Sequence, residues 1–140
     1  MLLDIVKYGN PVLRQKGERV GEIMPEITQL IDDMVDTMHE AHGIGLAAQQ
    51  VGKALQLTMV DVTDVEDRPS RMSIDGEAVK PEDYMPLILL NPEWTAVGDT
   101  KKEGPEGCLS FPEVYGDINR QEEIDVMATD EKGEAVAFRC

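Results

Sequence analysis

Two short runs in the middle of the chain combine residue types that could do chemistry. The first, Gly43 to Gln50, is rich in small residues and ends in a side-chain amide, and the second, Glu106 to Pro112, holds the thiol of Cys108 directly after a glycine. Glycine lets another chain approach the backbone closely, an amide can donate to a developing negative charge, and a thiolate binds soft metal ions. Together the two runs predict much of one active site.

The first run also fits a loose dinucleotide-binding pattern of two glycines and a later small residue, with Asp61 placed downstream as a ribose-binding acid. A dinucleotide loop follows a strand and opens a helix. Here the expected order is reversed, since a helix precedes the glycines and a strand follows them. The context therefore argues against a nucleotide cofactor. A helix cap followed by a tight turn explains the glycines but leaves Gln50 without a role.

The two histidines of the chain, His39 and His42, flank Glu40 and suggest a zinc helix. Their separation is three residues, whereas the H-E-x-x-H helix separates its histidines by four so that both rings meet one ion. Both rings are expected near the negative end of a helix, with His42 extending its apolar stripe, and a cation there needs no metal to explain it. We interpret them as structural. A metal module of His39, His42 and Cys108 remains an alternative.

Cys108 taken alone is typical of a small buried apolar residue. The residues around Cys108 favour a functional role. The two runs together resemble the first and second signature motifs of the peptide deformylases: Gly43 to Gln50 matches the glycine-x-glycine-apolar-Ala-Ala-x-Gln motif, and Glu106 to Ser110 matches Glu-Gly-Cys-Leu-Ser. The segment Asn10 to Arg14 is similar to the N-terminal part of the family, so the resemblance extends from near residue 5 to the end of the chain.

The resemblance implies a metal-dependent hydrolase that removes the formyl group from the N-terminal methionine of nascent peptides. It implies that Gln50 and the backbone N–H of Leu109 donate to the oxygen of the formyl carbonyl. It also implies that Cys108 binds one divalent ion, most often Fe2+, with Zn2+, Ni2+ or Co2+ as alternatives. The residues implied to bind the peptide are Ile44, Gly45 and Gly107, and Arg120 could pair with Glu106.

The third family motif, a helix with Gln-His-Glu-x-x-His, is absent from the 140 residues. Catalytic metal sites of this kind need three protein ligands and a water, and one cysteine does not provide them. Burial of the apolar side chains of such a helix would also contribute about 9–18 kcal/mol of stabilising free energy before the cost in conformational entropy is deducted. We therefore expect a single deformylase-like domain over residues 1–140 that is incomplete at its C-terminal end. The alternative is an inactive deformylase-like protein that binds peptides without a metal site.

Composition excludes other classes of function. The net charge of −15, from 13 basic and 28 acidic residues, argues against nucleic acid and anionic lipid as partners. The absence of a basic leader and of an apolar run of about 18 residues predicts a cytoplasmic protein without a membrane span. N-formylmethionyl peptides, and the ribosome that makes them, are the expected partners.

The elements that position the two runs can be predicted from hydrophobic spacing. Residues 1–21 are expected to form an irregular arm anchored by Leu13 and Val20. From Pro25 to a stop at Gly43, apolar residues recur every three and four positions, which predicts an amphipathic helix with its acidic residues Asp32, Asp33 and Asp36 facing away from the core.

Several strands should follow the helix. Leu55–Val62 and Pro86–Asn91 read as strands, the second buried on both faces, with shorter strands at Glu93–Val97 and around Lys101. Residues from Asp64 to Asp83, including Pro69, are expected to be a long mobile loop, and Pro112 should end regular pairing. Ile124–Ala128 and Ala135–Phe138 flank a predicted hairpin turn at Asp130–Gly133. One helix and several short antiparallel strands predict an α+β fold.

Overall fold

The protein has an α+β fold, as the sequence predicts. The computed structural model describes residues 1–65 and 70–140, and the expectation for Pro69 lies outside these residues. The described part contains one α-helix, α1 (Pro25–Glu40), and three short 3₁₀ helices, η1 (Pro11–Arg14), η2 (Ala48–Val51) and η3 (Pro81–Tyr84). The strands are β1 (Gly45–Ala47), β2 (Leu57–Val60), β3 (Met72–Ile74), β4 (Glu77–Val79), β5 (Leu87–Ala96), β6 (Lys101–Cys108), β7 (Phe111–Gln121), β8 (Ile124–Thr129) and β9 (Ala135–Arg139).

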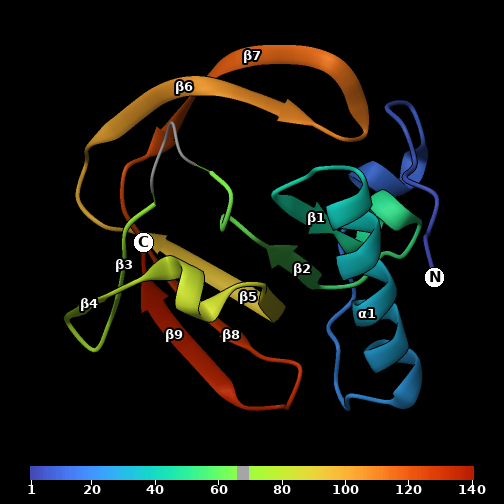
Figure 1. The fold of residues 1–140 in the computed structure, drawn as a ribbon, viewed down its shortest axis with the longest axis horizontal. Coiled ribbons are helices and arrows are strands. Elements are labelled where there is room, and N and C mark those ends of the chain that lie inside the picture. The colour runs from blue at the N-terminus through green and yellow to red at the C-terminus, as the bar shows by residue number, and fades with distance from the viewer. Residues whose placement is uncertain (66–69) are drawn as a thin grey trace.

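The strands form two antiparallel sheets. Among the described residues, seven strands pair in the order β1-β2-β5-β8-β9-β3-β4, and β6 pairs with β7 in a separate two-stranded sheet. Figure 1 shows the β6–β7 ribbon arching away from the larger sheet, with α1 standing beside β1 and β2. At its turn the β6–β7 ribbon returns toward β1 (Figure 1), and Cys108 at the end of β6 lies beside Gln50 of η2.

The core lies where α1 packs on the larger sheet. The buried residues of the helix include Ile31, Met34 and Met38, and they pack with Leu46 of β1 and with the central strands. The three-and-four spacing of these apolar residues places them on one side of the helix. The prediction of an amphipathic helix with one buried face is confirmed. A second cluster, formed by Met72, Leu89, Val126 and Phe138, lies between β3, β5, β8 and β9.

Two details of the helix differ from the prediction. Asp33 was expected to face solvent with Asp32 and Asp36, but its residue is only 8% exposed. The N-terminal arm covers it, and helical spacing cannot reveal a cover from another part of the chain. The helix also ends at Glu40, and His42, which was expected to extend the apolar stripe, lies beyond the helix with a left-handed φ of 55°.

The strands predicted from apolar runs are present with shifted ends. Leu55–Val62 contains β2, and the runs Pro86–Asn91 and Glu93–Val97 join into one strand, β5. A register shift between Leu90 and Glu93 bridges them, because the strand bulges there instead of ending. The predicted hairpin is confirmed: β8 pairs with β9 around a turn in which Gly133 has φ 82°.

The expectation of a long loop from Asp64 to Asp83 is wrong for most of its length. Strands β3 and β4 form a hairpin there, with Asp75 and Gly76 at the turn, and η3 follows. Met72 is buried against Phe138, so a few apolar residues within an acidic stretch are enough to dock the hairpin on β9. Average composition concealed this pattern.

The expectation that Pro112 ends regular pairing is also wrong. Phe111 pairs with Cys108, and β7 continues to Gln121 along the whole length of β6. Each strand of a two-stranded sheet has one free edge, so the missing N–H of a proline can face that edge without a lost bond. The sheet therefore tolerates Pro112 in β7.

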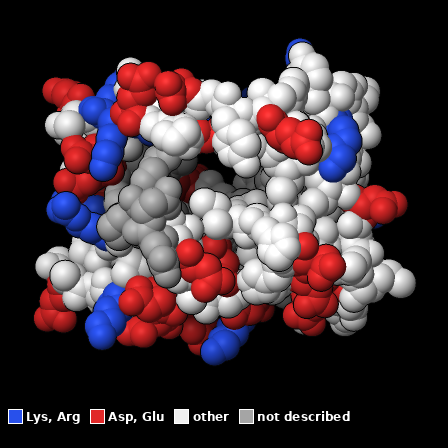
Figure 2. Space-filling model, turned by 45° about the horizontal axis from the view of Figure 1, so that its top comes forward, with Lys and Arg blue, Asp and Glu red and all other residues white. Residues whose placement is uncertain are grey.

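The surface is strongly acidic. Figure 2 shows Asp and Glu spread over one face and outnumbering Lys and Arg, around a hollow near its centre. This agrees with the net charge of −15. Within residues 1–65 and 70–140, none of the helices has the length and apolar character needed to cross a bilayer.

The N-terminal arm is irregular apart from η1, as expected, and Val20 is its buried anchor, while Leu13 is only half-buried. Near its end the arm crosses the start of β2. Glu18 N–H donates to the Ala54 carbonyl at 2.8 Å, and Gln56 N–H donates to the Glu18 carbonyl at 2.8 Å. At Gly17 the two backbones are so close that an added Cβ would lie 2.6 Å from the Leu55 carbonyl carbon.

This contact gives a matched pair of variants. We expect Gly17→Ala to lower the free energy of unfolding by about 1–3 kcal/mol, because the backbone of Leu55 cannot move aside without breaking its hydrogen bonds. Gly21→Ala has open space around its Cβ and should change stability by less than about 0.5 kcal/mol. Urea unfolding followed by circular dichroism measures both. Equal stabilities of the two variants would contradict the described path of the arm.

Candidate active site

Gln50 lies in η2, directly after the edge strand β1, and its side-chain amide is held at both ends. Its Oε1 accepts from the Ala47 N–H at 3.0 Å, and its Nε2 donates to Ser110 Oγ at 3.3 Å and lies 3.6 Å from Cys108 Sγ. The bond from Ala47 fixes which end of the amide faces the thiol. The NH2 group of Gln50 therefore points toward the second run.

The second run turns between β6 and β7. Cys108 ends β6 with its residue exposed, which contradicts the reading of this cysteine as a buried apolar residue. Ser110 is 4% exposed, and its hydroxyl accepts from Gln50. The sequence reasoning gave Ser110 no role of its own, and no local signal identifies one. Its function as the support of the Gln50 amide is visible only once the two runs meet.

Ile44 and Gly45 lie at an open edge of the larger sheet. In the part of the chain that the structure describes, strand β1 pairs with β2 on one side and has no partner on the other, with Gly45 opposite Val60. Ile44 is 54% exposed, and its carbonyl accepts from the Asp61 N–H at 2.9 Å. An unpaired edge with a glycine leaves N–H and C=O groups available to an extended peptide.

Two glycines of the runs allow close packing between neighbours. A Cβ on Gly43 would lie 2.7 Å from Leu109 Cδ1, and a Cβ on Gly107 would lie 2.7 Å from Tyr115 Cε1. Real Cβ contacts are longer than this. Gly43 therefore admits the Leu109 side chain to the end of α1, and Gly107 admits the Tyr115 ring from the facing strand.

Leu109 joins the hairpin turn to the core. Its half-buried side chain packs against the cluster formed by α1 and the larger sheet, and its carbonyl accepts from Lys7 Nζ at 3.3 Å. The structure thus brings Gln50, Cys108 and Leu109 to one end of the molecule, where the β6–β7 turn meets η2 and the arm.

Glu106 and Arg120 form an ion pair across the β6–β7 sheet. Arg120 Nε lies 3.0 Å from Glu106 Oε2, and its Nη2 lies 2.8 Å from Oε1, so the carboxylate is gripped at both oxygens. The hydrogen bonds and the charge of Glu106 raise the pKa of Arg120. The pairing suggested by the sequence is present, and it steadies the strand that carries Cys108.

His39 binds a carboxylate. Its Nε2 lies 2.9 Å from Asp61 Oδ2, while Asp61 Oδ1 accepts from the Thr63 N–H at 3.0 Å and from the Thr63 hydroxyl at 2.6 Å. Burial raises the pKa of Asp61, but the hydrogen bonds from Thr63 and the contact with His39 outweigh it and hold the pKa below its usual value. This pair ties the end of α1 to the residue that supports Ile44.

The donor set does not fit a catalytic metal ion. Across residues 1–65 and 70–140, no group of three or more His, Cys, Asp or Glu side chains could hold one. The alternative module of His39, His42 and Cys108, all of them described, is therefore not assembled. Cys108 is one thiol facing an amide, and a site with three protein ligands is not formed.

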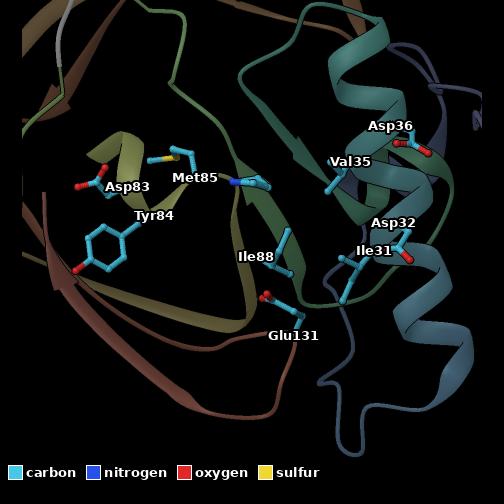
Figure 3. A pocket seen from close by; sticks show the side chains of 10 residues that line it. Ile31, Asp32, Val35, Asp36, Asp83, Tyr84, Met85, Ile88 and Glu131 are labelled. Atoms are coloured by element: carbon cyan, nitrogen blue, oxygen red, sulfur yellow. The ribbon is translucent and has the colours of Figure 1, made fainter. Parts of the chain in front are cut away.

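A cavity lies away from this site. It has a volume of about 650 Å³ and lies between α1 and the segment around η3. Figure 3 shows apolar Ile31, Val35 and Ile88 and the carboxylates of Asp36 and Asp83 around it. Gln50, Cys108 and Leu109 do not line this cavity.

The chain is similar to known proteins over its full length. Residues 2–140 match the family described as Polypeptide deformylase. Peptide deformylase of Opitutus terrae is 42% identical over all of this chain and 73% of its own length, and that of Aquifex aeolicus is 39% identical over 97% of this chain and 72% of its own length.

Solved structures of peptide deformylases have a similar fold. The peptide deformylase of Ehrlichia chaffeensis superposes with a TM-score of 0.84 at 31% identity, over 98% of this chain and 73% of that one. The peptide deformylase of Synechococcus elongatus in complex with actinonin gives 0.80 at 36% identity, over 99% of this chain. The present chain spans 65% of the length of the Synechococcus protein.

The contact of His39 with Asp61 predicts a pH dependence. Because the pKa of Asp61 is lowered from 3.8 by folding, its stabilising effect is present above that value and is lost as the pH falls through the folded pKa. Asp61→Asn should therefore be less stable than the parent protein at about pH 6, and the gap should narrow as the pH falls below the ordinary carboxyl pKa of 3.8 and through the lowered pKa of Asp61. Thermal unfolding across this range measures the gap.

The matched control is Asp64→Asn, which replaces an exposed carboxylate three residues away. Its stability should follow that of the parent protein at every pH. A gap for Asp61→Asn that stays constant between these pH values would show that the pair does not act through the charge of Asp61.

Proposed function

Because the chain belongs to the polypeptide deformylase family, we propose that it acts in the hydrolysis of the formyl group from N-formylmethionyl peptides of nascent proteins. The observation that carries the proposal is the meeting of the two runs, with Gln50 Nε2 within 3.6 Å of Cys108 Sγ. The family acts on a linear amide, and such a reaction needs donors fixed where charge develops. The expected setting is the cytoplasm, where the ribosome delivers the peptides.

The peptide would bind along β1 as an added strand. The free edge of β1 supports this, because Gly45 offers an unpaired backbone and Ile44 is exposed beside it. Backbone pairing gives affinity without sequence preference, and an exposed apolar side chain such as Ile44 suits contact with a methionine. Gly107 would lie on the opposite wall, where the β6–β7 turn comes close to η2.

The amide of Gln50 and the backbone N–H of Leu109 would donate to the formyl oxygen. As water adds to the carbonyl carbon, this oxygen gains negative charge, and fixed donors stabilise the charge without reorganising. The Gln50 amide accepts a hydrogen bond from the Ala47 N–H and donates one to Ser110 Oγ, and these two bonds fix its orientation before the peptide binds. Preorganisation of this kind is what makes such donors effective.

The family depends on a divalent metal ion, and we propose Cys108 as one ligand, with Fe2+ as the first choice and Zn2+, Ni2+ or Co2+ as alternatives. The described residues do not complete the ligand set. Their own chemistry is limited to binding the peptide and the developing oxyanion. The expectation that the domain is incomplete at its C-terminal end stays a prediction, which the downstream coding sequence tests through the presence or absence of an in-frame His-Glu-x-x-His motif.

The second candidate function is peptide binding without hydrolysis. It is favoured by the incomplete donor set around Cys108, because the open edge of β1 needs no metal to bind an extended peptide. The two candidates differ in one product, formate. The chain is incubated under anaerobic conditions with Fe2+ and a formyl-Met-Ala-Ser peptide. Formate release supports the enzyme, and saturable peptide binding without formate supports the binding protein.

Neighbouring glutamines offer a matched test of the oxyanion donor. Gln50→Met should lower kcat for formyl-peptide hydrolysis by about 100- to 1,000-fold with little change in KM, because the donor acts mainly in the transition state. Gln49→Met is the control. The Gln49 side chain donates to the Gln15 carbonyl, and it is not among the described contacts of Cys108. Initial rates of formate release measure both. An equal loss in the two variants would indicate damage to η2 and contradict the assigned role.

A further inference from the structure

The loop between α1 and β1, residues 41–44, presents Ile44 at the open edge of the larger sheet. Its first part is bonded to the end of the helix, where the Gly43 N–H donates to the Met38 carbonyl at 2.9 Å. His42 has a left-handed φ of 55°, a conformation that residues other than glycine rarely adopt. The conformation of this loop therefore depends on the contacts that hold its two ends.

Asp61 holds the second end of the loop. Its backbone N–H donates to the Ile44 carbonyl at 2.9 Å, one step beyond the register that pairs Gly45 with Val60. Its side chain is only 15% exposed. The backbone N–H and the hydroxyl of Thr63 both donate to its Oδ1, and Oδ2 faces α1. The position of Ile44 therefore depends on the position of Asp61.

His39 connects the two ends of the loop. Its carbonyl accepts from the His42 N–H at 3.1 Å, and its ring Nε2 lies 2.9 Å from Asp61 Oδ2. An ionised carboxylate only accepts hydrogen bonds, so Nε2 is a protonated ring nitrogen and donates to Asp61. His39 thus contacts the start of the loop through its backbone and the support of Ile44 through its side chain.

The position of Ile44 matters because of the side chain that it would contact. Under the proposed function, the peptide pairs along β1 and its methionine side chain packs on Ile44, which is 54% exposed. A long apolar side chain loses many contacts when the surface beneath it moves, whereas a methyl group makes few of them. A residue that fixes Ile44 should therefore affect the affinity for methionine more than the affinity for alanine.

We propose that His39 and Asp61 are positioning residues for peptide recognition, which hold Ile44 where it contacts the methionine side chain and thereby strengthen the preference of the site for methionine over a small first residue. This role rests on the proposed function and deepens it. The two residues have no contact with the peptide and no part in the hydrolysis. Their effect reaches the peptide through residues 41–44.

Peptide affinity gives the first test. Formyl-Met-Ala-Ser and formyl-Ala-Ala-Ser are titrated into the full chain, and the amide signals of Ile44 and Gly45 in NMR spectra give the two dissociation constants. We expect His39→Ala to weaken binding of the methionine peptide by about two- to fivefold, the range for loss of an exposed charged contact. Binding of the alanine peptide should change by less than about 1.5-fold, since it makes little contact with Ile44.

Two further variants separate the ring contact from the helix end. His39→Gln should restore most of the preference, because its side-chain NH2 group can donate to Asp61 Oδ2. Glu40→Gln is the matched control, since Glu40 is the next residue of α1 and is not among the described contacts of Asp61 or Ile44. It should keep the affinity of the parent chain for both peptides. Equal weakening in His39→Ala and Glu40→Gln would indicate damage to the helix end and contradict the assigned role.

Amide hydrogen exchange tests the positioning without a peptide. The Asp61 N–H donates to Ile44, and the Asn91 N–H donates to the Gln56 carbonyl at 2.8 Å in another part of the chain. In His39→Ala the Asp61 amide should exchange about two- to fivefold faster, while the Asn91 amide keeps its rate. An equal change at both amides would be a general loss of stability and would contradict a positioning role.

The outcomes distinguish this role from the proposed function. A parent chain that binds neither peptide overturns the proposed function and the role of His39 with it. A parent chain that binds the methionine peptide, together with an unchanged preference or an unchanged Asp61 exchange rate in His39→Ala, overturns the positioning role alone. If His39→Ala does not fold, His39→Asn, whose amide is too short to reach Asp61 Oδ2, should give the results expected of it.

Discussion

The structure depends on one junction, where the Gln50 amide meets the turn between β6 and β7. Within residues 1–65 and 70–140 the larger sheet and the β6–β7 sheet share no strand pairing, and side chains and the N-terminal arm hold the turn against η2. Ser110 supports the amide from one side and Ala47 from the other. The same contacts that join the two sheets therefore aim the donor that the chemistry needs.

Small residues allow the elements at this junction to pack closely. Gly43 leaves space for the Leu109 side chain at the end of α1, and Gly107 leaves space for the Tyr115 ring. Gly43 and Gly107 thus have a packing reason in addition to their place in the family motifs. The residues of such a motif are therefore required both for the chemistry of the site and for the close packing of the elements around it.

The sequence predicted what depends on local periodicity. The apolar spacing of Ile31, Met34 and Met38 gave the helix, and the turn at Gly133 gave the last hairpin, because both patterns are set within a few residues. The sequence-based prediction failed where contacts between distant segments determine the local structure. Met72 docks an acidic stretch onto β9, Pro112 is tolerated because β7 has a free edge, and Asp33 is buried by the arm. Ser110 acquires its role only when Gln50 comes beside it.

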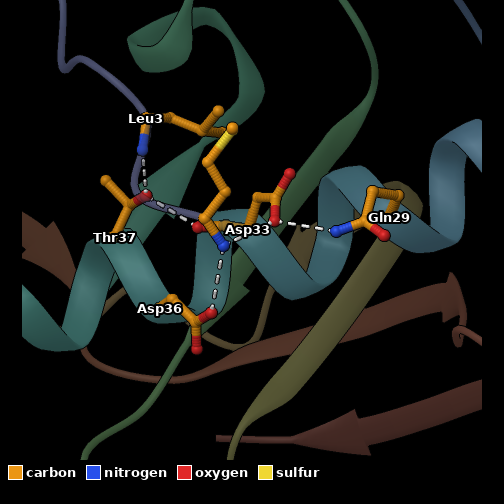
Figure 4. A network of polar contacts seen from close by, with 6 residues as sticks. Leu3, Gln29, Asp33, Asp36 and Thr37 are labelled. Atoms are coloured by element: carbon orange, nitrogen blue, oxygen red, sulfur yellow. Dashed lines mark hydrogen bonds and ion pairs between the residues drawn. The ribbon is translucent and has the colours of Figure 1, made fainter.

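Contacts to Asp33 relieve part of an electrostatic conflict in α1. The helix carries Asp33, Asp36 and Glu40 in its second half, where the partial negative charge of the helix end disfavours acids. The net charge of −15 adds to the repulsion. Gln29 offsets part of this repulsion, because its Nε2 donates to Asp33 Oδ1 at 2.9 Å (Figure 4). The arm packs beside this carboxylate, where the Leu3 N–H donates to Thr37 Oγ1 on α1, and the arm in turn reaches Gln50 and Ser110.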